Sequence, residues 1–367
     1  MVLEDCRRGA YALERFATVR AYMSSGIKLI AERANVSIST VSHVLNGTAP
    51  ISEGVQERVL SVARDTGYLA KRKRKASISL LPTVLLVACD ATLPKSDRNL
   101  VAWTMINAFR NECRARGIRI IPHIEPGSEI DPENVATAIA KHNPNGIAVM
   151  QDDRPVLIDR LHELGPEIVV LSGQDPSMRV DTVSPGNQFG ACLATRYLFS
   201  LGHTRIGHLT WGQRLTTRQR MYGFIDAHRE RGLKVHDDAI IDVGDYQQHV
   251  VEKNMDRWIE TAGPKLPFTA LFCAADNAAI GAMNSLRKAG YRIPEDISVM
   301  GFDNALFGEF QEPPLTTMHV PMEEIGHVAL NLLEEALTLP KGARSPRRVE
   351  LGCRLIERKS TAPLARG

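Results

Sequence analysis

The stretch from Asn35 to Gly47, NVSISTVSHVLNG, combines hydroxyl and amide side chains with regularly spaced aliphatic ones. Serine and threonine weaken a helix, and a plain surface helix would more often carry Glu, Lys or Ala. A helix that enters the major groove of DNA needs side chains that reach base edges, polar groups that reach phosphates, and an apolar face against a supporting helix. The stretch supplies all three, which favours DNA binding over a surface helix with a polar face.

Each side of this predicted helix has a separate role in the hypothesis. The side chains expected to pack against the preceding helix are Val36, Val41, Val44 and Leu45. The candidates for base contacts are Ile38, Ser39 and His43. The candidates for phosphate contacts or helix support are Ser37, Thr40, Ser42, Asn46 and, in the preceding helix, Lys28.

Three short helical patterns separated by turn residues surround this stretch. They run from Ile27 to Arg33, from Ser37 to Leu45 and from Glu53 to Thr66. Ser37 can cap the second helix by accepting a hydrogen bond from a backbone amide in its first turn. A unit of about 40 residues is near the lower limit for a self-sufficient core, so we expect it to be marginally stable alone.

The net charge of +3 conceals an excess of basic residues at the N-terminal end. Residues 1–75 contain 13 Lys and Arg against 7 Asp and Glu, which leaves 32 against 35 for residues 76–367. An uninterrupted basic run closes the first part: Lys71, Arg72, Lys73, Arg74 and Lys75. A solvated linker is the plain interpretation, but beside a DNA-reading helix we interpret the run as a phosphate contact.

From Thr83 onward, short apolar runs alternate with stretches of helical periodicity. The runs are TVLLVACD, IRIIPHIE, GIAVM, EIVVLSG, RIGHLT, AIIDVG, ALFCAAD, ISVMGFD and TTMHV. Runs this short, joined by roughly 12 to 20 residues of helical periodicity, are typical of parallel strands buried on both faces. Residues 83–360 are too many for one sheet, so we predict two doubly wound α/β lobes. Such lobes bind ligands outside the carboxyl ends of their strands.

Composition excludes several classes of protein. The 44% hydrophobic and 24% charged fractions are ordinary for a globular protein. No apolar run reaches the ~18 residues of a membrane span, and the N-terminus lacks the apolar segment of a signal peptide, so we expect a cytoplasmic protein with no membrane partner. The six cysteines are scattered without zinc-ligand spacing, so we expect buried free thiols, no metal and no cofactor.

Two adjacent segments carry a resemblance. IKLIAERANVSISTVSHVLNG, followed by ISEGVQERVLSVARDTGY, resembles the DNA-binding headpiece of the lac repressor/galactose repressor (LacI/GalR-type) family of bacterial transcription regulators. Later segments, among them YLFSLGHTRIGHLT, RQRMYGF and AADNAAIGAMNSLRKAGYRIPEDISVMGFDN, resemble its effector-binding core. The resemblance covers residues 27–360 in the family's order. It implies a homodimer whose paired headpieces read a pseudo-palindromic operator, with an affinity set by a small molecule between two lobes.

The predicted fold class is therefore multidomain, with a small all-α helix-turn-helix headpiece and two doubly wound, periplasmic-binding-protein-like α/β lobes. The predicted boundaries are an unplaced extension (1–26), headpiece (27–70), basic hinge (71–82), core (83–360) and tail (361–367). Within the core, the first lobe takes about 83–198 and 320–340 and the second about 199–318 and 347–360. Met23 is our candidate for the natural start, which mass spectrometry of the native N-terminus would test.

The headpiece and hinge depart from the family at two points. By position, His43 falls at a base-reading site where the family usually has Arg; Arg pairs bidentately with guanine whereas His offers one bond, so we expect a different operator base. The family's hinge inserts a Leu into the minor groove, but the same register gives Ser77 here, or Ile78 or Leu80 in a shifted helix. We expect a weaker kink and a steep salt dependence carried by the basic run.

The resemblance implies five effector-binding positions: Asp90, Arg220, Tyr246, Ala275 and Asp303. Asp90 and Asp303 each end an apolar run, so both carboxylates are expected at one crevice, where they accept hydrogen bonds from hydroxyl or ring N–H groups. The planar fork of Arg220 suits a carboxylate, a phosphate or paired hydroxyls, although a structural salt bridge between Arg220 and Asp303 is the alternative. The position of Tyr246 implies an aromatic ring against the ligand.

Two cleft positions differ from the family, since Ala275 replaces a usual Asn and Gly186 a usual Asp. The chain also has an insertion between Pro94 and Ala102 near the crevice. These changes alter the hydrogen-bond pattern or leave room for a bulkier ligand, so the expected effectors are a sugar, a sugar acid or a nucleoside or purine. Trp211 is expected to pack its own loop rather than stack on the ligand.

Three rival interpretations remain. A solute-binding protein would use the same lobes but no headpiece. An enzyme would need a nucleophile motif, a metal cluster or a phosphate loop, and the sequence has none of these. A DNA-binding regulator whose cleft has lost its ligand would answer to a partner protein instead. The resemblance to the family favours a repressor over an activator. The sequence leaves open whether the ligand releases the protein from DNA or holds it there.

Overall fold

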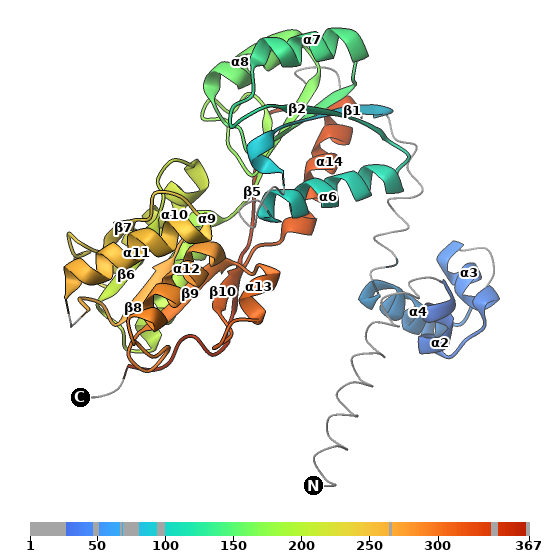
Figure 1. The fold of residues 1–367 in the computed structure, drawn as a ribbon. Coiled ribbons are helices and arrows are strands. Elements are labelled where there is room, and N and C mark those ends of the chain that lie inside the picture. Colours follow the sequence, from blue (N-terminus) through green and yellow to red (C-terminus); the bar gives the residue numbers. More distant parts are fainter. Residues whose placement is uncertain are drawn as a thin grey trace. The chain divides into compact units, whose positions relative to one another are not determined.

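The computed structural model describes residues 27–46, 51–66, 68, 81–93, 100–263, 266–338 and 344–364. The chain forms two compact units, Met1–Ile78 and Ser79–Gly367 (Figure 1). Four expectations concern residues outside the described ranges: the start at Met23, the basic run Lys71–Lys75, the hinge positions 77, 78 and 80, and most of the inserted loop.

The first unit contains the three expected helices. They are α2 (Ile27–Ala34), α3 (Ile38–Asn46) and α4 (Glu53–Asp65). The capping prediction is confirmed, because Ser37 Oγ accepts a hydrogen bond of 3.0 Å from the backbone amide of Thr40. One side chain or more from each helix enters a common small core: Ile30, Ala31, Ala34, Val41, Val59 and Ala63.

The first lobe of the second unit is built on one six-stranded sheet. Its strands are β1 (Thr83–Cys89), β2 (Arg119–Glu125), β3 (Gly146–Met150), β4 (Glu167–Leu171), β5 (Asp181–Pro185) and β11 (Arg348–Leu351). Their order is β11-β5-β4-β3-β1-β2, and every neighbouring pair is parallel. One face carries α6 (Leu100–Ala115) and α14 (Met322–Thr338), and the other carries α7 (Pro132–His142) and α8 (Pro155–Leu164) (Figure 1).

Strand β1 shows why its sequence is apolar throughout. Val84, Leu86 and Ala88 belong to the core that includes α6 and α14. Leu85 and Val87 belong to the separate core that includes α7 and α8. Because side chains alternate across a strand, a sheet covered by helices on both faces needs apolar residues at every position.

The second lobe repeats this architecture. Its strands are β6 (Ile206–Thr210), β7 (Ile240–Asp242), β8 (Ala270–Cys273), β9 (Ser298–Asp303), β10 (Thr316–His319) and β12 (Arg354–Ile356), in the order β12-β10-β9-β8-β6-β7. Only β12 runs antiparallel to its neighbour among these described strands. The helices are α9 (Asn187–Ser200), α10 (Leu215–Glu230), α11 (Gln248–Ala262), α12 (Asp276–Lys288) and α13 (Leu306–Glu309). The two doubly wound lobes are confirmed.

The lobe boundaries differ from the expected ones in two places. Helix α9 packs on α10, β10 and β12, so the chain enters the second lobe at Asn187 and not near residue 198. Strand β11, assigned by sequence to the second lobe, pairs with β5 in the first sheet. The chain therefore crosses between lobes three times, after β5, between β10 and α14, and between β11 and β12.

Two chemical expectations can be compared with the described residues. Their five cysteines are free thiols, and all except the half-buried Cys353 are buried. Among these residues, no helix has the length and apolarity to cross a membrane, and no group of three or more His, Cys, Asp or Glu side chains could hold a metal ion.

The second lobe contains three buried histidines. His208 on β6 is fully buried between the rings of Phe224 and Phe272, with centroid separations of 5.1 and 4.9 Å. Burial lowers the pKa of His208 from 6.5 to about 3. Burial also lowers the pKa of His203 and of His228.

We predict that acid destabilises the protein through His208. Below pH 6.5 the unfolded chain takes up a proton on this imidazole and the folded chain does not, so stability present above pH 6.5 is lost as pH falls. Between pH 7.5 and 5.5, His208 alone should lower the free energy of unfolding by about 1.4 kcal/mol. Urea unfolding at both values measures this loss, which should shrink by that amount in His208→Gln. An unchanged pH dependence in the variant would contradict the assignment.

Candidate functional site

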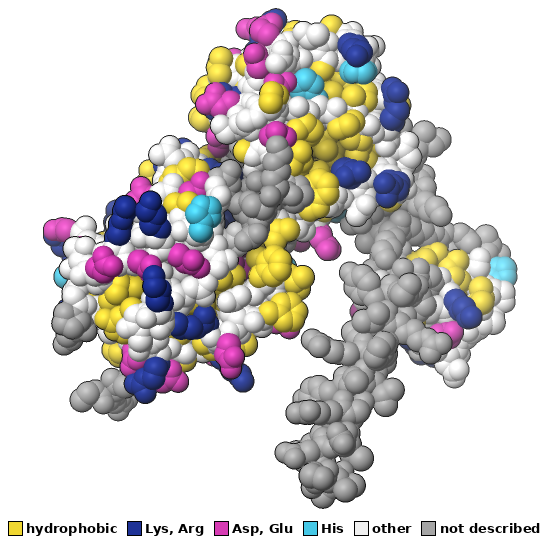
Figure 2. Space-filling view, in the orientation of Figure 1, with side chains coloured by type: hydrophobic (Ala, Val, Ile, Leu, Met, Phe, Trp, Pro, Cys, Tyr) yellow, Lys and Arg dark blue, Asp and Glu magenta, His cyan; other side chains and the backbone are white. Residues whose placement is uncertain are grey.

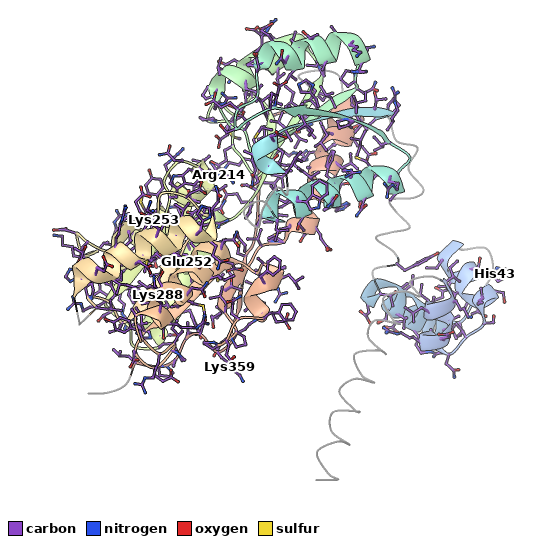
Figure 3. All side chains as sticks on the ribbon, in the orientation of Figure 1. His43, Arg214, Glu252, Lys253, Lys288 and Lys359 are labelled. Atoms are coloured by element: carbon purple, nitrogen blue, oxygen red, sulfur yellow. The ribbon has the colours of Figure 1, made fainter. Side chains whose placement is uncertain are left out.

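The outer face of α3 carries the residues expected to read bases. Ile38 is 53% exposed although it is apolar, and Ser39 and His43 are also exposed. Figure 3 shows His43 at the outer side of the headpiece. Val41, in contrast, is fully buried on the inner side of the same helix. The helix thus presents the three candidates together on a face that no other described helix covers.

The remaining DNA-contact candidates lie around the start of α3. Ser37 Oγ lies 2.7 Å from Ser39 Oγ and 2.8 Å from Thr40 Oγ1, which concentrates hydroxyl groups beside the helix N-terminus. Such an end presents backbone N–H groups and a positive partial charge, which suits a phosphate. Lys28 is exposed on α2 and Ser42 is half-buried. Asn46 ends the helix, and its side chain lies outside the described atoms.

Two neighbouring cavities lie between the lobes, at the carboxyl ends of the strands. The smaller has a volume of about 60 Å³ and the larger about 620 Å³. Both are lined by Gln151, Ser172, Arg214 and Thr216. The order in each sheet reverses between β1 and β3 and between β6 and β8, and these reversals are where doubly wound sheets bind ligands.

Strained backbone marks the same strand ends. Gln151 follows β3 with φ 56°, and Ser172 follows β4 with φ 56°. Asp303 ends β9 with φ 124°, and Asn304 follows with φ 57°. A positive φ at a residue other than glycine costs of order 1–3 kcal/mol and concentrates at functional sites. Sequence reasoning missed both residues, although Gln151 directly follows the run GIAVM and Ser172 lies near the end of the run EIVVLSG.

The smaller cavity brings together four of the five expected effector residues: Arg220, Tyr246, Ala275 and Asp303. Asp90 is not among the residues lining either interlobe cavity; it lies half-buried in the short turn η1 (Asp90–Thr92). Its neighbours Cys89, Ala91 and Thr92 line the larger cavity instead. The expectation that Asp90 and Asp303 face one crevice therefore does not match the cavity lining.

Arg220 and Asp303 form a buried ion pair, with 3.1 Å between Nη1 and Oδ1. The guanidinium is fixed by a 2.9 Å hydrogen bond from Nε to Asn187 Oδ1 and lies 3.9 Å from the ring centroid of Phe302. Among the described residues, Asp303 Oδ1 accepts no hydrogen bond of good geometry and Arg220 Nη2 donates none. Arg220 and Asp303 thus form the salt bridge that was the alternative to ligand binding. One donor of Arg220 and one acceptor of Asp303 nevertheless remain for a ligand.

A second carboxylate lies behind this pair. Asp276 begins α12, is fully buried, and accepts hydrogen bonds from Thr317 Oγ1 (2.6 Å) and the Ala305 amide (2.7 Å). Burial, and next the charge of Asp303, raise the pKa of Asp276 to about 7. Burial likewise raises the pKa of Asp303, against the effect of Arg220. The charge of the Asp276 and Asp303 carboxyl groups therefore depends on which molecule occupies the cavity.

Aromatic residues form one wall of the cleft. Tyr246 is buried, and its ring meets that of Trp211 edge-on at 5.9 Å. The Tyr246 hydroxyl accepts a 3.0 Å hydrogen bond from the Trp211 amide. Trp211 thus packs against Tyr246, which follows β7, and also lines the larger cavity. Ala275 precedes α12 without a side-chain cap, and Gly186 likewise precedes α9.

Several polar residues of the larger cavity were not anticipated. Arg214, from the second lobe, donates a 3.4 Å hydrogen bond to Gln151 Oε1 of the first lobe and so spans the cleft. Asp152 is held by Arg154 at 2.8 Å. Burial, then the charge of Asp152, raise the pKa of Asp153. Sequence offered one signal for this group, the cluster QDDR directly after the β3 run.

Comparison with known proteins matches each of the two units to a described protein family or domain. Residues 26–70 match the family described as "Bacterial regulatory proteins, lacI family", and residues 195–361 match the "Periplasmic binding protein-like domain". The "HTH-type transcriptional repressor PurR" of Vibrio cholerae (serotype O1, strain M66-2) is 31% identical over 349 residues, covering 93% of this chain and 99% of that protein. The chain belongs to the lacI family of bacterial regulatory proteins. It is a DNA-binding transcriptional regulator with an effector-binding core.

Further relatives agree with this family assignment. The protein of the same description from Photobacterium profundum is 30% identical over 343 residues, covering 92% of this regulator and 99% of that protein. The solved "transcriptional regulator CelR-cellobiose complex" has a TM-score of 0.68 at 25% identity, covering 91% of this chain and 99% of its own. A lac repressor dimer bound to operator and anti-inducer, at 20% identity and TM-score 0.66, covers 91% and 98% and shares the fold.

Proposed function

We propose that this regulator is a cytoplasmic repressor that binds a pseudo-palindromic operator through α3 of two headpieces. In this account Ile38, Ser39 and His43 contact bases. The exposed apolar side chain of Ile38 supports this, because a major groove offers thymine methyl groups as apolar partners. We assign no catalytic activity to the protein.

We further propose that a small polar molecule in the interlobe cleft controls operator affinity. The observation that carries this is the hydrogen-bonding capacity left in one buried ion pair. Among the described residues, Asp303 Oδ1 accepts no hydrogen bond of good geometry and Arg220 Nη2 donates none. A ligand with a hydroxyl or ring N–H beside an acceptor oxygen would satisfy both atoms. The larger cavity, about 620 Å³, falls within the usual range for small-molecule sites.

The effector classes that fit are sugars, sugar acids and nucleosides or purines. Each offers paired hydroxyl or N–H donors with neighbouring acceptors, and each has a ring that could contact Tyr246 in the smaller cavity or Trp211 in the larger one. One structural neighbour is titled as a cellobiose complex and another as carrying bound ribose. A cleft that binds no metabolite and answers to a partner protein is the alternative.

We propose a homodimer that uses α13. Leu306, Phe307 and Phe310 are 67%, 48% and 74% exposed, although all three are large and apolar. Leu306 and Phe307 also line a groove of about 540 Å³ whose walls include Val101 and Met322. Figure 2 shows hydrophobic side chains gathered over α13. A contiguous exposed apolar patch of this kind marks a protein interface.

A thermal-shift screen of the three metabolite classes tests effector control. A ligand at 100 times its Kd stabilises a folded protein by about 2.7 kcal/mol, so one class should raise the Tm by several degrees. The stabilising compound should also change operator affinity, because a ligand shifts the lobe equilibrium only by its differential affinity. If no compound raises the Tm, the partner-protein alternative is favoured.

A further inference from the structure

Side chains of opposite charge face each other across the larger interlobe cavity. The first lobe lines it with three carboxylates and one guanidinium, a balance of −2: Glu129, Asp152, Asp153 and Arg154. On the second lobe, the segment 211–218 (WGQRLTTR) contains Arg214 and Arg218 and no acid, a balance of +2. We call the first group the acidic lip of the cleft, and Arg214 with Arg218 the basic lip.

Hydrogen bonds within the second lobe fix the shape of the basic lip. The buried Thr217 hydroxyl donates to the Trp211 carbonyl at 2.7 Å and lies 3.0 Å from the Arg214 carbonyl. Arg218 Nη1 donates to the Gly212 carbonyl at 3.1 Å. Because these bonds are all local, the loop between β6 and α10 presents its two guanidinium groups whether or not the first lobe is close.

The two lips already interact across the cleft. Arg214 donates a 3.4 Å hydrogen bond to Oε1 of Gln151, the residue before the QDDR cluster's first aspartate. Figure 3 shows Arg214 on the side of the second lobe that faces the first. Burial, and next the charge of Asp152, raise the pKa of Asp153, and the charge of Arg218 on the other lobe opposes this rise. Both guanidinium groups of the basic lip therefore act on the first lobe.

The position of the lips gives them leverage over the angle between the lobes. The chain crosses between the lobes after β5, between β10 and α14, and between β11 and β12. The larger cavity is lined instead by the ends of β1, β3 and β4 and by the loops after β2 and β6. An attraction that acts away from the crossovers changes the angle between the lobes more than one that acts beside them.

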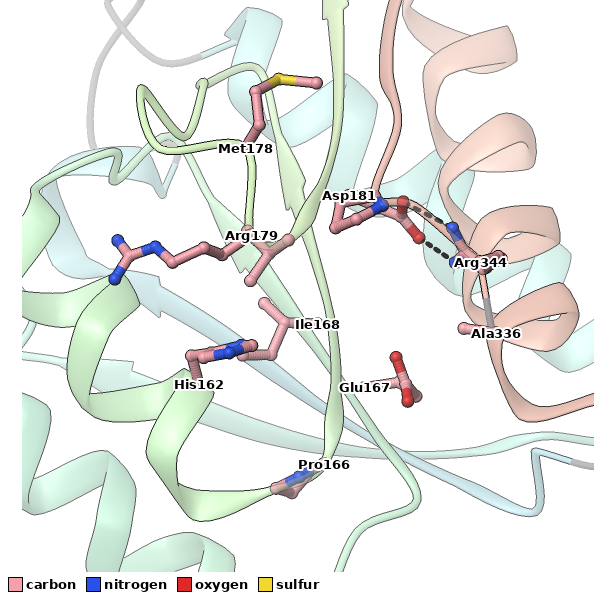
Figure 4. A pocket seen from close by; sticks show the side chains of 11 residues that line it. His162, Pro166, Glu167, Ile168, Met178, Arg179, Asp181, Ala336 and Arg344 are labelled. Carbon is pink, nitrogen blue, oxygen red and sulfur yellow. Dashed lines mark hydrogen bonds and ion pairs between the residues drawn. The ribbon is translucent and has the colours of Figure 1, made fainter. Parts of the chain in front are cut away.

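A further cavity, at the amino ends of β4 and β5, has a different arrangement of charges (Figure 4). Its volume is about 350 Å³, and its acidic and arginine residues all belong to the first lobe: Glu167, Arg179, Asp181 and Arg344. Arg344 donates a 2.9 Å hydrogen bond to Asp181. Attraction within one lobe does not draw the two lobes together, so these charges differ in their effect from those of the lips.

We propose that the acidic and basic lips form an electrostatic clasp, which holds the cleft of the ligand-free protein closed. Salt weakens the attraction between partly exposed charges, so the closed population falls as ionic strength rises. A ligand that enters the larger cavity passes between the lips, and the clasp therefore sets how readily the cleft opens to it. The clasp is a property of the ligand-free protein and requires neither operator nor effector.

Acrylamide quenching of Trp211 fluorescence in the full-length protein tests the clasp, because this half-buried side chain lines the larger cavity. The signal of Trp211 is isolated by subtracting the emission of Trp211→Phe, which retains Trp103 and Trp258. Raising NaCl from about 0.1 M to about 1 M shortens the Debye length from about 10 Å to about 3 Å, so the Stern–Volmer constant of Trp211 should rise at least about twofold.

Three variants, each measured with its own Trp211→Phe counterpart, identify the charges responsible. Arg214→Gln/Arg218→Gln should show the high Stern–Volmer constant already at low salt. Arg229→Gln/Lys234→Gln is the matched control, since it removes two positive charges that are 76% and 85% exposed on the same lobe and do not line the cavity. Asp153→Asn, on the other lobe, should act like the first pair without altering the loop between β6 and α10.

Three results would each overturn the proposal: quenching of Trp211 that does not change with salt, a control pair that behaves like the clasp pair, or an Asp153→Asn variant that matches the wild-type protein. Circular dichroism melting of each variant verifies that it remains folded. The measurement uses neither DNA nor an effector, so its outcome is independent of the function proposed above.

Discussion

Phe310→Asp is expected to yield a monomer that binds operator DNA at least about 100-fold more weakly than the wild-type protein. Phe310 is 74% exposed in the isolated chain and belongs to the apolar surface of α13. A carboxylate placed at the centre of an apolar interface is desolvated without a partner, which costs several kcal/mol. Loss of the dimer separates the two headpieces, so binding to the two half-sites is no longer one event.

Phe189→Asp is the matched control for this experiment. Phe189 is also a phenylalanine of the second lobe, is also 74% exposed, and lies on α9. Sedimentation velocity should show monomers for Phe310→Asp and dimers for Phe189→Asp, and fluorescence anisotropy should show near-normal operator affinity only for the latter. A dimeric Phe310→Asp variant would contradict the assignment of α13 to the interface.

Arg220→Ala is expected to abolish the effector response and to lower the free energy of unfolding by roughly 3–5 kcal/mol, because it leaves a buried charge without its partner. The effect should be large here since Asp276 lies behind Asp303 and already has a pKa raised to about 7. Without the guanidinium, two carboxylates would share one buried region. Urea unfolding and the thermal shift produced by the effector measure the two losses separately.

The double variant Arg220→Ala/Asp303→Ala separates structure from binding. Removing both members of a buried ion pair costs much less than removing one, so most of the lost stability should return. The effector response should stay absent, because neither the donor nor the acceptor remains for the ligand. A restored effector response in the double variant would show that the ligand binds elsewhere.

The three helices of the headpiece could be predicted closely because capping residues and helical periodicity, which are both local in sequence, determine where they lie. The hydroxyl of Ser37 caps α3, and the positions of Val41 and Ile30 follow from helical periodicity, so neighbours in sequence determine the three helices. The nine apolar runs all became strands for a similar reason, since a sheet covered on both faces requires continuous apolar sequence.

The three missed strands lack that local signal. The β5 segment DTVSP mixes polar residues with a proline, and the edge strands β11 and β12 carry charged residues such as Arg348 and Arg354. Each of these segments lies next to a crossover between the lobes, and it forms a strand because the crossover places it beside a strand of the sheet. The same crossovers explain the misplaced boundary near residue 198, because α9 has no sequence feature that shows which sheet it covers.

The candidate cleft was predictable in part. Arg220 and Asp303 follow from the resemblance, and the structure brings them to 3.1 Å. Gln151, Ser172 and Arg214 escaped prediction because their roles depend on backbone strain and on the approach of two lobes, which neither spacing nor composition encodes. Asp90 was expected in the cleft from its place after β1, but it lies in the turn η1, where its neighbours Cys89, Ala91 and Thr92 line the larger cavity and Asp90 does not.

The central claim is that paired α3 helices read DNA under the control of the two-lobed core. Selection from random double-stranded DNA by the full-length protein, with and without a metabolite mixture, tests this most directly. The account predicts enrichment of a pseudo-palindromic sequence, an affinity that changes with metabolites, and altered bases at symmetric positions when His43→Ala replaces the wild-type protein. No enrichment over random competitor under either condition would contradict it.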